Sequence, residues 1–526
     1  MTDNRIQSMP PTRRGFLSRL GVAAGMLPFS GWLTSGAYAQ TVPRVRYEVF
    51  SPKGLAMLNR YSQAVGIMKD RLPAHHPHSW RFQTSIHAVA NTGDLPPGTN
   101  PADEDIDTIF RAKHGENAAT VMAHRKLALG AEPGGQIGDD RTWSTCPHHT
   151  PTRQFLPWHR FYLAYFEQII EKVLGKPFSL PYWDYFNPAK RHLPPMFAPQ
   201  FIGGRKNPLY FAARSSEFKR NGLSADVIPV LNDPDKGSLL KNPSLLGTPR
   251  RFGFNNELEG QLHDLIHGSV GTRFGMANVS WAARDPIFWL HHANIDRVWE
   301  SWRRPGPDGS SSLDPGNGDA WYNAQYAFVN AAGAAVRSDS PDRAMRAAFN
   351  LKYKYDFLIP LDAMPLAVGE AAGPSAPTKT HEGSAANAKI RGANDSVTIP
   401  LAPAAPDGVA LGLSTNTATR WALNLKLLTA PAPGLYRVFM ENSLGTTGAT
   451  QAPVQIGVFS LFSLQGANGH VHTGSAPMET TVELDITGKV RDHTIDPLRP
   501  GKLSIKPAYL EDPVDITVRG VEIIAK

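Results

Sequence analysis

The chain has 526 residues, of which 41% are hydrophobic and 19% are charged, and its net charge is +8. This length allows roughly two to four domains, and the composition is ordinary for a soluble globular protein. The basic residues form no long run, which argues against a nucleic-acid partner because such binding needs a clustered basic surface. The single cysteine, Cys146, excludes an internal disulfide framework.

The N-terminal segment predicts export. The sequence TRRGFL at 12–17 is a twin-arginine motif, a weakly apolar run follows it, and Ala37-Tyr38-Ala39 supplies the small residues that signal peptidase requires. We therefore predict that residues 1–39 are a signal peptide for the twin-arginine export machinery, with a periplasmic or extracellular mature protein. The apolar run is too short and too rich in glycine to span a membrane, and no other segment approaches that length.

Residues from about 50 to 365 carry helical patterns, separated by long loops that contain proline and glycine. In FYLAYFEQIIEKVL, residues 161–174, apolar side chains recur every three or four positions, and Gly175 is a stop signal. We expect residues 40–365 to form one mainly helical domain. Residues 366–395 are rich in Ala, Gly, Pro and Ser, which predicts a linker or an exposed loop.

The pattern changes after residue 395. Six short segments alternate in polarity or are rich in β-branched residues, with turn residues between them: SVTIPL, WALNLKLL, GLYRVFME, VQIGVFSLFS, TTVELDIT and VDITVRGVEII. Such segments predict an antiparallel sandwich or barrel over residues 396–526. The predicted fold class is therefore a mainly α domain followed by an all-β C-terminal domain.

Histidines are concentrated in a few segments. His263 and His267 lie four residues apart in the helical pattern ELEGQLHDLIHG, so both imidazoles point to one face of the helix and can bind one metal ion. Asp264 follows His263, so the zinc-protease motif HExxH is absent. The adjacent pair His291 and His292 in DPIFWLHHANIDRVW can supply a third imidazole from a neighbouring helix.

A second set of histidines lies earlier in the chain. The segment CPHHTPTRQFLPWHR contains His148, His149 and His159, and SWRFQTSIHAV contains His87. Two sets of three imidazoles indicate two metal ions, and such donors suit copper, zinc, iron or nickel rather than magnesium or calcium. Two open three-histidine sites that face each other suit copper ions that hold O2. A dizinc hydrolase is the alternative, although such sites usually contain carboxylate ligands.

Two long motifs make the sequence similar to a known family. The first is a histidine, five residues, FLPWHR and a glutamate seven residues after the arginine, and it runs here from His149 to Glu167. The second, D-P-x-F-aromatic-x-x-H-x-x-x-D, runs from Asp285 to Asp296. The chain resembles the tyrosinase and polyphenol oxidase family of type-3 copper proteins, which also includes molluscan haemocyanins. The resemblance covers residues 45–360 and, more loosely, the C-terminal β domain of the plant enzymes.

The resemblance implies a dicopper centre held in a four-helix bundle. It assigns three histidines to each copper ion: His87, His149 and His159 to the first, and His263, His267 and His292 to the second. His148 is the alternative to His149, because Cys146-Pro147-His148 matches the Cys-x-His pattern in which relatives form a thioether. His291 is expected to pack beside the site, and Phe288 to pack against a ligand imidazole.

The activity implied by the resemblance is the oxidation of phenols by O2, both the ortho-hydroxylation of monophenols to catechols and the oxidation of o-diphenols to o-quinones. A phenol has a pKa of about 10, so a base must help it to lose its proton. The resemblance places Glu259 and Asp264 at the positions that hold a water for this step, although relatives commonly have an asparagine where Asp264 stands. A catechol oxidase without hydroxylase activity is the alternative, and a non-catalytic O2 carrier is a further one. In latent relatives the C-terminal domain covers the copper entrance, so residues 396–526 are a candidate lid.

Overall fold

The structure is a computed structural model, and it describes the chain from residue 44 to residue 525 with gaps. The described ranges are 44–73, 76–88, 146–148, 152–229, 239–248, 251–339, 341–346, 350–360, 378–392, 394–404, 420–429, 434–442, 452–462, 477–498, 500–509 and 515–525. The predicted signal peptide and His149 lie outside these ranges. Within them, no helix has both the length and the apolar character that a membrane span requires.

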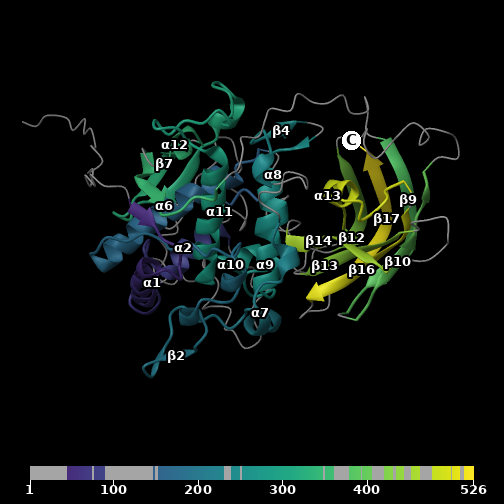
Figure 1. The fold of residues 1–526 in the computed structure, drawn as a ribbon. Coiled ribbons are helices and arrows are strands. Elements are labelled where there is room, and N and C mark those ends of the chain that lie inside the picture. Colours follow the sequence, from purple (N-terminus) through teal and green to yellow (C-terminus); the bar gives the residue numbers. More distant parts are fainter. Residues whose placement is uncertain are drawn as a thin grey trace, which may run out of the picture. The chain divides into compact units, whose positions relative to one another are not determined.

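Helices carry the first part of the described chain, as Figure 1 shows in purple to green. Local signals define several of their ends. The Ser51 side chain accepts a hydrogen bond at the start of the first helix and Ser79 does so at the second, while Gly175 ends α6 with a φ of 62°. The predicted stop at Gly175 is therefore confirmed. The principal helices are α1 (Pro52–Asp70), α2 (Trp80–His87), α6 (Phe155–Leu174), α9 (Asp264–Val270) and α11 (Ile287–Arg303).

Shorter elements connect these helices. The α-helical segments are α7 (Ser216–Asn221), α8 (Phe254–Glu257), α10 (Val279–Ala282) and α12 (Pro341–Met345), and η6 (Leu258–His263) is a π-helical turn. The 3-10 turns are η2 (Pro188–Lys190), η3 (Pro195–Phe197), η4 (Ala225–Val227), η5 (Leu239–Lys241) and η7 (Ala320–Asn323). Strand β1 (Arg44–Arg46) pairs in parallel with β8 (Tyr353–Tyr355). The small antiparallel pairs are β2 (Phe201–Ile202) with β3 (Arg205–Lys206), β4 (Gly247–Thr248) with β5 (Arg251–Phe252), and β6 (Tyr326–Val329) with β7 (Ala335–Asp339).

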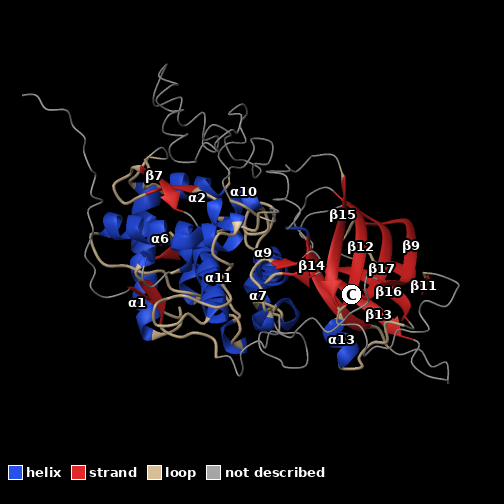
Figure 2. Cartoon of the chain, turned by 90° about the horizontal axis from the view of Figure 1, so that it is seen from above, coloured by secondary structure: helices blue, strands red, loops and turns tan. Residues whose placement is uncertain are grey.

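The C-terminal part of the described chain consists of two antiparallel sheets, drawn in red in Figure 2. Residues from both sheets, including Val438 and Leu503 from one and Leu423 and Val521 from the other, share one buried hydrophobic cluster. The predicted order, a helical region followed by a β region, is confirmed. The first sheet has the order β10 (Val397–Pro400), β16 (Pro500–Tyr509), β13 (Leu435–Asn442) and β14 (Val454–Ser460). The second has the order β11 (Ala402–Pro403), β9 (Thr378–Ile390), β17 (Ile516–Ala525), β12 (Trp421–Thr429) and β15 (Met478–Asp485), and α13 (Thr487–Arg491) follows β15.

The linker predicted at 366–395 is wrong over much of its length, because residues 378–390 form strand β9 inside the second sheet. Strand pairing uses backbone groups, so a segment of small residues can form a strand if neighbouring strands supply the hydrogen bonds. Gly383 illustrates why a residue without a side chain is needed at one position of this strand. A Cβ atom there would lie 2.6 Å from the carbonyl oxygen of Pro400 and 2.7 Å from Ile399 Cγ2.

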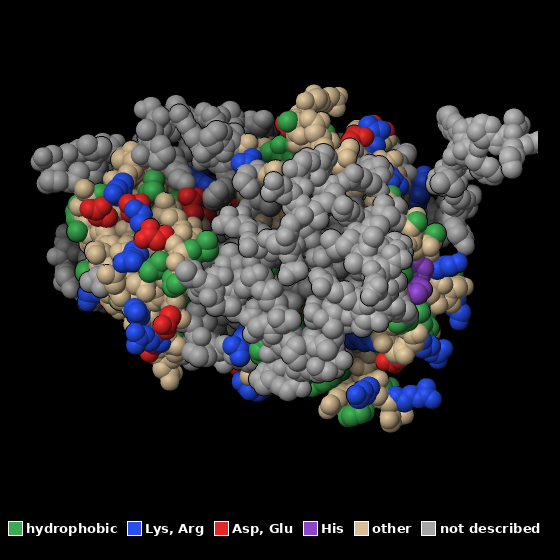
Figure 3. All heavy atoms as spheres, turned by 180° about the vertical axis from the view of Figure 1, so that it is seen from behind, with side chains coloured by type: hydrophobic (Ala, Val, Ile, Leu, Met, Phe, Trp, Pro, Cys, Tyr) green, Lys and Arg blue, Asp and Glu red, His purple; other side chains and the backbone are tan. Residues whose placement is uncertain are grey.

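Figure 3 shows one face of the molecule. On the face in Figure 3, the described Lys and Arg side chains are scattered, and many lie near Asp or Glu side chains.

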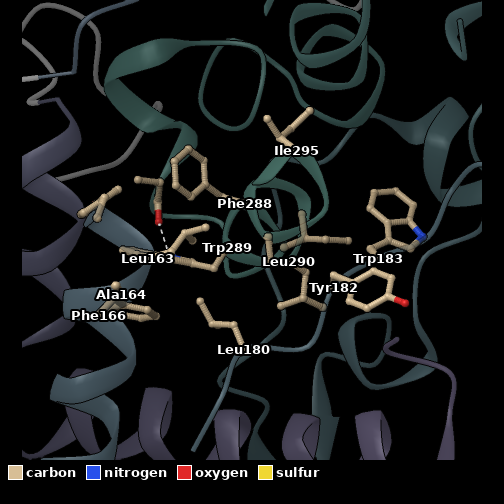
Figure 4. Close-up of a cluster of buried hydrophobic side chains, with 14 of the residues drawn as sticks. Leu163, Ala164, Phe166, Leu180, Tyr182, Trp183, Phe288, Trp289, Leu290 and Ile295 are labelled. Atoms are coloured by element: carbon tan, nitrogen blue, oxygen red, sulfur yellow. Dashed lines mark hydrogen bonds between the residues drawn. The ribbon is translucent and has the colours of Figure 1, made fainter. Parts of the chain in front are cut away.

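The core between α6 and α11 is aromatic and aliphatic (Figure 4). The rings of Phe166 and Trp289 stack with centroids 3.5 Å apart, and Leu163 and Leu290 belong to the same buried cluster. Every residue of α11 is buried. Polar side chains on this helix therefore need partners inside the protein, and its two histidines are the most conspicuous of them.

Candidate metal centre

Eight buried or partly buried residues form two groups of donor atoms. Within each group, one nitrogen or sulfur atom per residue lies within 4.8 Å of the others. The first group consists of His87, Cys146, His148 and His159, and the second consists of His263, His267, His291 and His292. All seven histidines are buried. Among the described residues, no further group of His, Cys, Asp and Glu meets this criterion.

Backbone carbonyl groups orient three of these imidazoles. The Nδ1–H group of His87 donates to Val279 O (3.1 Å), that of His159 to Phe155 O (2.8 Å) and that of His267 to Met276 O (2.6 Å). Each of these bonds fixes the tautomer and leaves the lone pair on Nε2. Metal-binding histidines in proteins are typically held in this way.

The π-helical turn η6 positions His263 at the junction with α9. The Nδ1–H group of His263 donates to Asp264 Oδ1 at 2.9 Å, so a carboxylate orients this ring. The rings of His263 and His267 lie 4.3 Å apart, as expected for residues four positions apart on one helical face. A π-helical turn is rare and is often found at functional sites.

The two groups face each other. Nε2 of His148 lies 3.5 Å from Nε2 of His263, and the rings of His159 and His292 stack with centroids 4.2 Å apart and planes at 11°. Two metal ions bound by these groups would therefore be neighbours. This arrangement can place one small molecule in contact with both ions.

Burial keeps the imidazoles in the neutral form that binds metals. It lowers the pKa of His159 and of His267 to about 3. Burial also lowers the pKa of His263 and His292, and the neighbouring imidazoles add to this effect. At neutral pH these side chains therefore carry lone pairs and no charge.

The Cys146 thiol lies beside two histidines of the first group. Its Sγ atom is 2.9 Å from Nδ1 of His148 and 3.4 Å from Nε2 of His159. Burial and the nearby carboxylate of Glu259 raise the pKa of the thiol, so it is protonated at neutral pH. A thioether between Cys146 and His148 stays a prediction, and the two side chains are close enough to form one.

The structure describes one of the two adjacent histidines between which the sequence left the choice open. His148 lies in the first group, with its ring 5.2 Å from that of His87 and 5.4 Å from that of His159. His149, the choice favoured by the sequence motif, falls outside the described residues. The described chain therefore brings His148 to the centre.

The other predicted site residues are also buried here. The ring of Phe288 packs 4.1 Å from that of His292 and 4.9 Å from that of His87. Glu259 and Asp264 are 1% and 2% exposed, so neither lies on a solvated helix face. Asp264 contacts His263 directly, whereas Glu259 lies one turn earlier, on η6.

A buried network of charges holds the helices that carry the histidines. Asp296 on α11 accepts hydrogen bonds from Arg46 (2.9 Å) and Arg160 (2.5 Å). Arg46 also pairs with Glu167, and Arg160 with Glu300. Glu167 and Asp296 are the last residues of the two sequence motifs. Their contacts explain why carboxylates stand there: they join α6, α11 and β1 around the centre.

Phe462, just after β14, reaches the centre from the β region. Its ring stacks on that of His267 (4.3 Å, 22°) and lies edge-on to those of His148 and His263, each at 5.6 Å. It also packs with Ala88 and Val279. The sequence could not reveal this role, because an apolar residue next to a predicted strand is normally expected to pack in the core of the β region.

A polar clamp joins the same part of the β region to the helical region. Asp226, on η4, accepts hydrogen bonds from Arg437 Nε (2.6 Å), from Gln455 Nε2 (2.9 Å) and from the Ser224 hydroxyl. Partial burial opposes ionisation, but these hydrogen bonds outweigh it and lower the pKa of Asp226 to about 2. Gly268 marks the same junction, because a Cβ atom there would lie 2.8 Å from Ser460 Oγ.

Sequence comparisons match the helical region to one family. The family profile "Common central domain of tyrosinase" matches residues 77–226 and 232–305. The chain is 31% identical over 229 residues to the tyrosinase of Streptomyces antibioticus, covering 39% of this chain and 78% of that protein. It is 30% identical over 297 residues to the tyrosinase HcTyr1 of a Hahella species, covering 53% of this chain and 56% of that protein. The match therefore spans about half the length of the Hahella relative.

Solved structures align with nearly the whole chain. Latent apple tyrosinase aligns with a TM-score of 0.52 and 19% identity, covering 92% of this chain and 98% of that one. A latent aurone synthase, described as a polyphenol oxidase, aligns with a TM-score of 0.53 and 20% identity, covering 93% and 90%. At these identities the likeness concerns the fold, a helical core followed by a β region.

Proposed function

Because the chain belongs to the tyrosinase and polyphenol oxidase family, we propose that it oxidises phenols with O2 at a dicopper centre. The observation that carries this proposal is the pair of facing histidine groups. Members of this family are dicopper oxidoreductases that use O2, and neutral imidazoles are donors that copper prefers. The four helices of the proposed bundle are α2, α6, α9 and α11.

The proposed copper ligands are three histidines from each group. His87, His148 and His159 would hold the first ion, and His263, His267 and His292 the second. His148 takes the place first given to His149, because its ring lies beside those of His87 and His159. The carbonyl groups and the carboxylate that accept from Nδ1 support the assignment of His87, His159, His263 and His267, since they leave Nε2 for the ion.

The proposed reaction includes both steps of a tyrosinase. The copper pair would activate O2 and exchange electrons with the phenol. In the balanced overall reaction of a monophenol, one monophenol and one O2 give one o-quinone and one water. In that of an o-diphenol, two o-diphenols and one O2 give two o-quinones and two waters. The chain itself must exclude bulk water, stack the phenol ring on an imidazole and accept the phenolic proton.

Glu259 and Asp264 are the proposed groups that guide this proton. Both are buried, and the Asp264 carboxylate already holds Nδ1–H of His263, which places its charge across one imidazole ring from the proposed second copper. A water held by these carboxylates can take the phenolic proton and so favour hydroxylation. If they serve only to orient His263, the enzyme is the alternative, a catechol oxidase.

The β region is the proposed lid, and Phe462 is its contact residue. Its ring lies face-to-face with His267, in the position in which a phenol would stack on a ligand imidazole. A substrate ring and the Phe462 ring cannot occupy this place together. The enzyme would then be latent until the segment carrying Phe462 moves away.

Oxygen uptake by the copper-loaded full chain tests the proposal. Tyramine alone and 4-methylcatechol alone would be given to the wild type and to Phe462→Ala. We expect uptake with both phenols and rates higher by about tenfold or more in Phe462→Ala, since apparent affinity rises with the open fraction. Phe439→Ala is the matched control, because Phe439 lies on β13 against Lys506 and should leave the rates unchanged.

The results separate the candidate functions. Uptake with 4-methylcatechol but not with tyramine, in both proteins, would identify a catechol oxidase. The Phe462 contact also favours a second candidate, an O2 carrier with a blocked entrance. Reversible O2 binding without turnover, even in Phe462→Ala, would identify that carrier and disprove the phenol oxidase. Zinc in place of copper in metal analysis of the purified chain would indicate a hydrolase.

We also propose that the twin-arginine segment exports the chain. Arg13 and Arg14 form the motif, and Ala37-Tyr38-Ala39 is the proposed cleavage site. Replacing both arginines with lysine should keep the uncleaved chain in the cytoplasm, which cell fractionation and the intact mass would show. Export of the double variant at the wild-type level would disprove this route.

A further inference from the structure

His291 is the fourth imidazole of the second group and has no role in the proposed three-histidine site. It is fully buried on α11, and its Nδ1 atom lies 3.1 Å from the Tyr185 hydroxyl. Among the described residues, its Nε2 atom has no hydrogen-bond partner. A buried polar atom without a partner typically costs about 1–3 kcal/mol. Such an atom needs an explanation, and a metal ion next to it would be one.

The position of the ring fits a metal donor. The His291 ring lies 5.5 Å from that of His263, 5.0 Å from that of His267 and 5.1 Å from that of His292. One nitrogen from each of the four rings falls within the 4.8 Å that defines the group. Consecutive residues on an α-helix point about 100° apart, so His291 approaches the ion from a different side than His292 does.

Tyr185 fixes this ring in a useful orientation. When Nδ1–H of His291 donates to the Tyr185 hydroxyl oxygen, the lone pair lies on Nε2, as in the carbonyl-bound histidines of the centre. Tyr185 is itself fully buried, so its hydroxyl group has no access to solvent as an alternative partner. The Tyr185–His291 pair therefore presents a preformed donor.

A permanent fourth ligand would conflict with the reaction. The proposed phenol oxidase needs an open position at the second copper for O2 and the phenol, and a fourth imidazole would fill it. A donor that binds the ion only while it enters or leaves the site does not block the open position during the reaction. It can lower the barrier for ligand exchange by replacing one histidine at a time.

We propose that His291 is an auxiliary copper donor, which binds the second ion during its uptake and release and leaves it once His263, His267 and His292 hold it. This inference rests on the proposed dicopper centre. A donor that stabilises the transition state of exchange speeds both directions and leaves the equilibrium affinity nearly unchanged. A residue that only supports the site would have the opposite signature when replaced, faster release and weaker binding.

Copper exchange in the full chain tests this proposal without measuring turnover. The probe is copper(I) supplied as a complex with a chromophoric chelator, whose colour reports uptake by the copper-free chain and release from the loaded chain. The variant is His291→Asn, because the asparagine amide can still meet the Tyr185 hydroxyl but has no donor at the Nε2 position. The matched control is His192→Asn, which removes an exposed histidine that packs on Phe50.

For His291→Asn we expect uptake and release of one of the two ions to slow by about tenfold, with two ions bound at saturation and an affinity within a few-fold of the wild type. His192→Asn should match the wild type. Unchanged rates, or faster release with weaker binding, would overturn the proposal. Failure of the wild type to bind two copper ions would overturn the dicopper centre instead, so the two failures are distinguishable.

A second variant keeps the test decisive if His291→Asn does not fold, which thermal unfolding of the copper-free chain would show. Tyr185→Phe removes the hydroxyl that holds the ring and leaves the His291 donor in place. It should slow uptake and release by a smaller factor than His291→Asn. Exchange rates equal to those of the wild type in Tyr185→Phe would overturn the proposed role of the pair.

Discussion

The two histidine groups are built from the chain in different ways. The first draws its donors from α2, from residues 146–148 and from α6, of which α2 is far in the sequence from the other two. The second takes all four imidazoles from two segments, η6 with α9 and then α11. Helix geometry alone places His263 and His267 together, whereas the first group exists only after distant segments have packed.

The groups also differ in how the β region meets them. Phe462 stacks face-to-face on His267 of the second group but lies edge-on to His148 of the first. In the second group His263 donates a hydrogen bond to the Asp264 carboxylate, and this group contains four imidazoles, whereas the described first group contains three imidazoles and a thiol. The first group is thus the more dependent on tertiary packing, and the second is the group on which substrate access and proton transfer are expected to depend.

The largest effect is expected from removing one ligand of either group. His159→Ala and His292→Ala should each lower bound copper toward one ion per chain and reduce catechol oxidation by about a thousandfold or more, since the ions act as a unit. Metal analysis and oxygen uptake measure the two effects, with His192→Ala as the control. Two ions retained in His292→Ala would show that the second site is misassigned.

The next largest effect is expected from removing the negative charge of Asp296, which pairs with Arg46 on β1 and Arg160 on α6. Asp296→Asn leaves Arg46 and Arg160 without their shared carboxylate, so we expect the copper-free chain to lose about 3 kcal/mol or more of unfolding free energy. Asp485→Asn, which affects a partly exposed pair with Arg420, should cost less than about 1 kcal/mol. Urea unfolding measures both. Equal losses would contradict a special role for the buried network.

A smaller change is expected from Asp264→Asn. The amide oxygen can still accept from Nδ1–H of His263, so two copper ions should remain bound. Losing the negative charge should change the ratio of monophenol to diphenol oxidation by about tenfold, because the proposed base assists the loss of the proton from the monophenol more than from the diphenol. Oxygen uptake with tyramine and with 4-methylcatechol gives this ratio. An unchanged ratio would remove Asp264 from the proton path.

The smallest effect concerns the clamp that holds the β region near the second group. The pKa of Asp226 is lowered to about 2, so its stabilising contribution is complete above the unfolded pKa of about 4 and is lost as the pH falls through about 2. Asp226→Asn should therefore increase tyramine oxidation several-fold at neutral pH. Thermal unfolding of both proteins should show a stability difference that shrinks between about pH 4 and about pH 2. A difference that grows in this range would contradict the clamp.

Much of the fold could be predicted because it depends on local pattern. Gly175 ended α6 as expected, and segments such as WALNLKLL and GLYRVFME became β12 and β13. Strands β9 and β16 were missed, since small residues and prolines hide them and backbone pairing with β17 and β13 creates them. The strand preference of individual residues does not predict such segments, because neighbouring strands supply the backbone hydrogen bonds that make them strands.

The sequence by itself determined which histidines to consider, how they are spaced on their helices and which metals their chemistry suits, because these properties depend on residue type and helical period. Only the tertiary structure decided that His148 lies beside His87, that His291 belongs to the second group, and that Phe462 from the β region stacks on His267. These contacts join residues far apart in the chain or on different faces of a helix. Local periodicity carries no information about them, since it is the packing of complete elements that brings such side chains together.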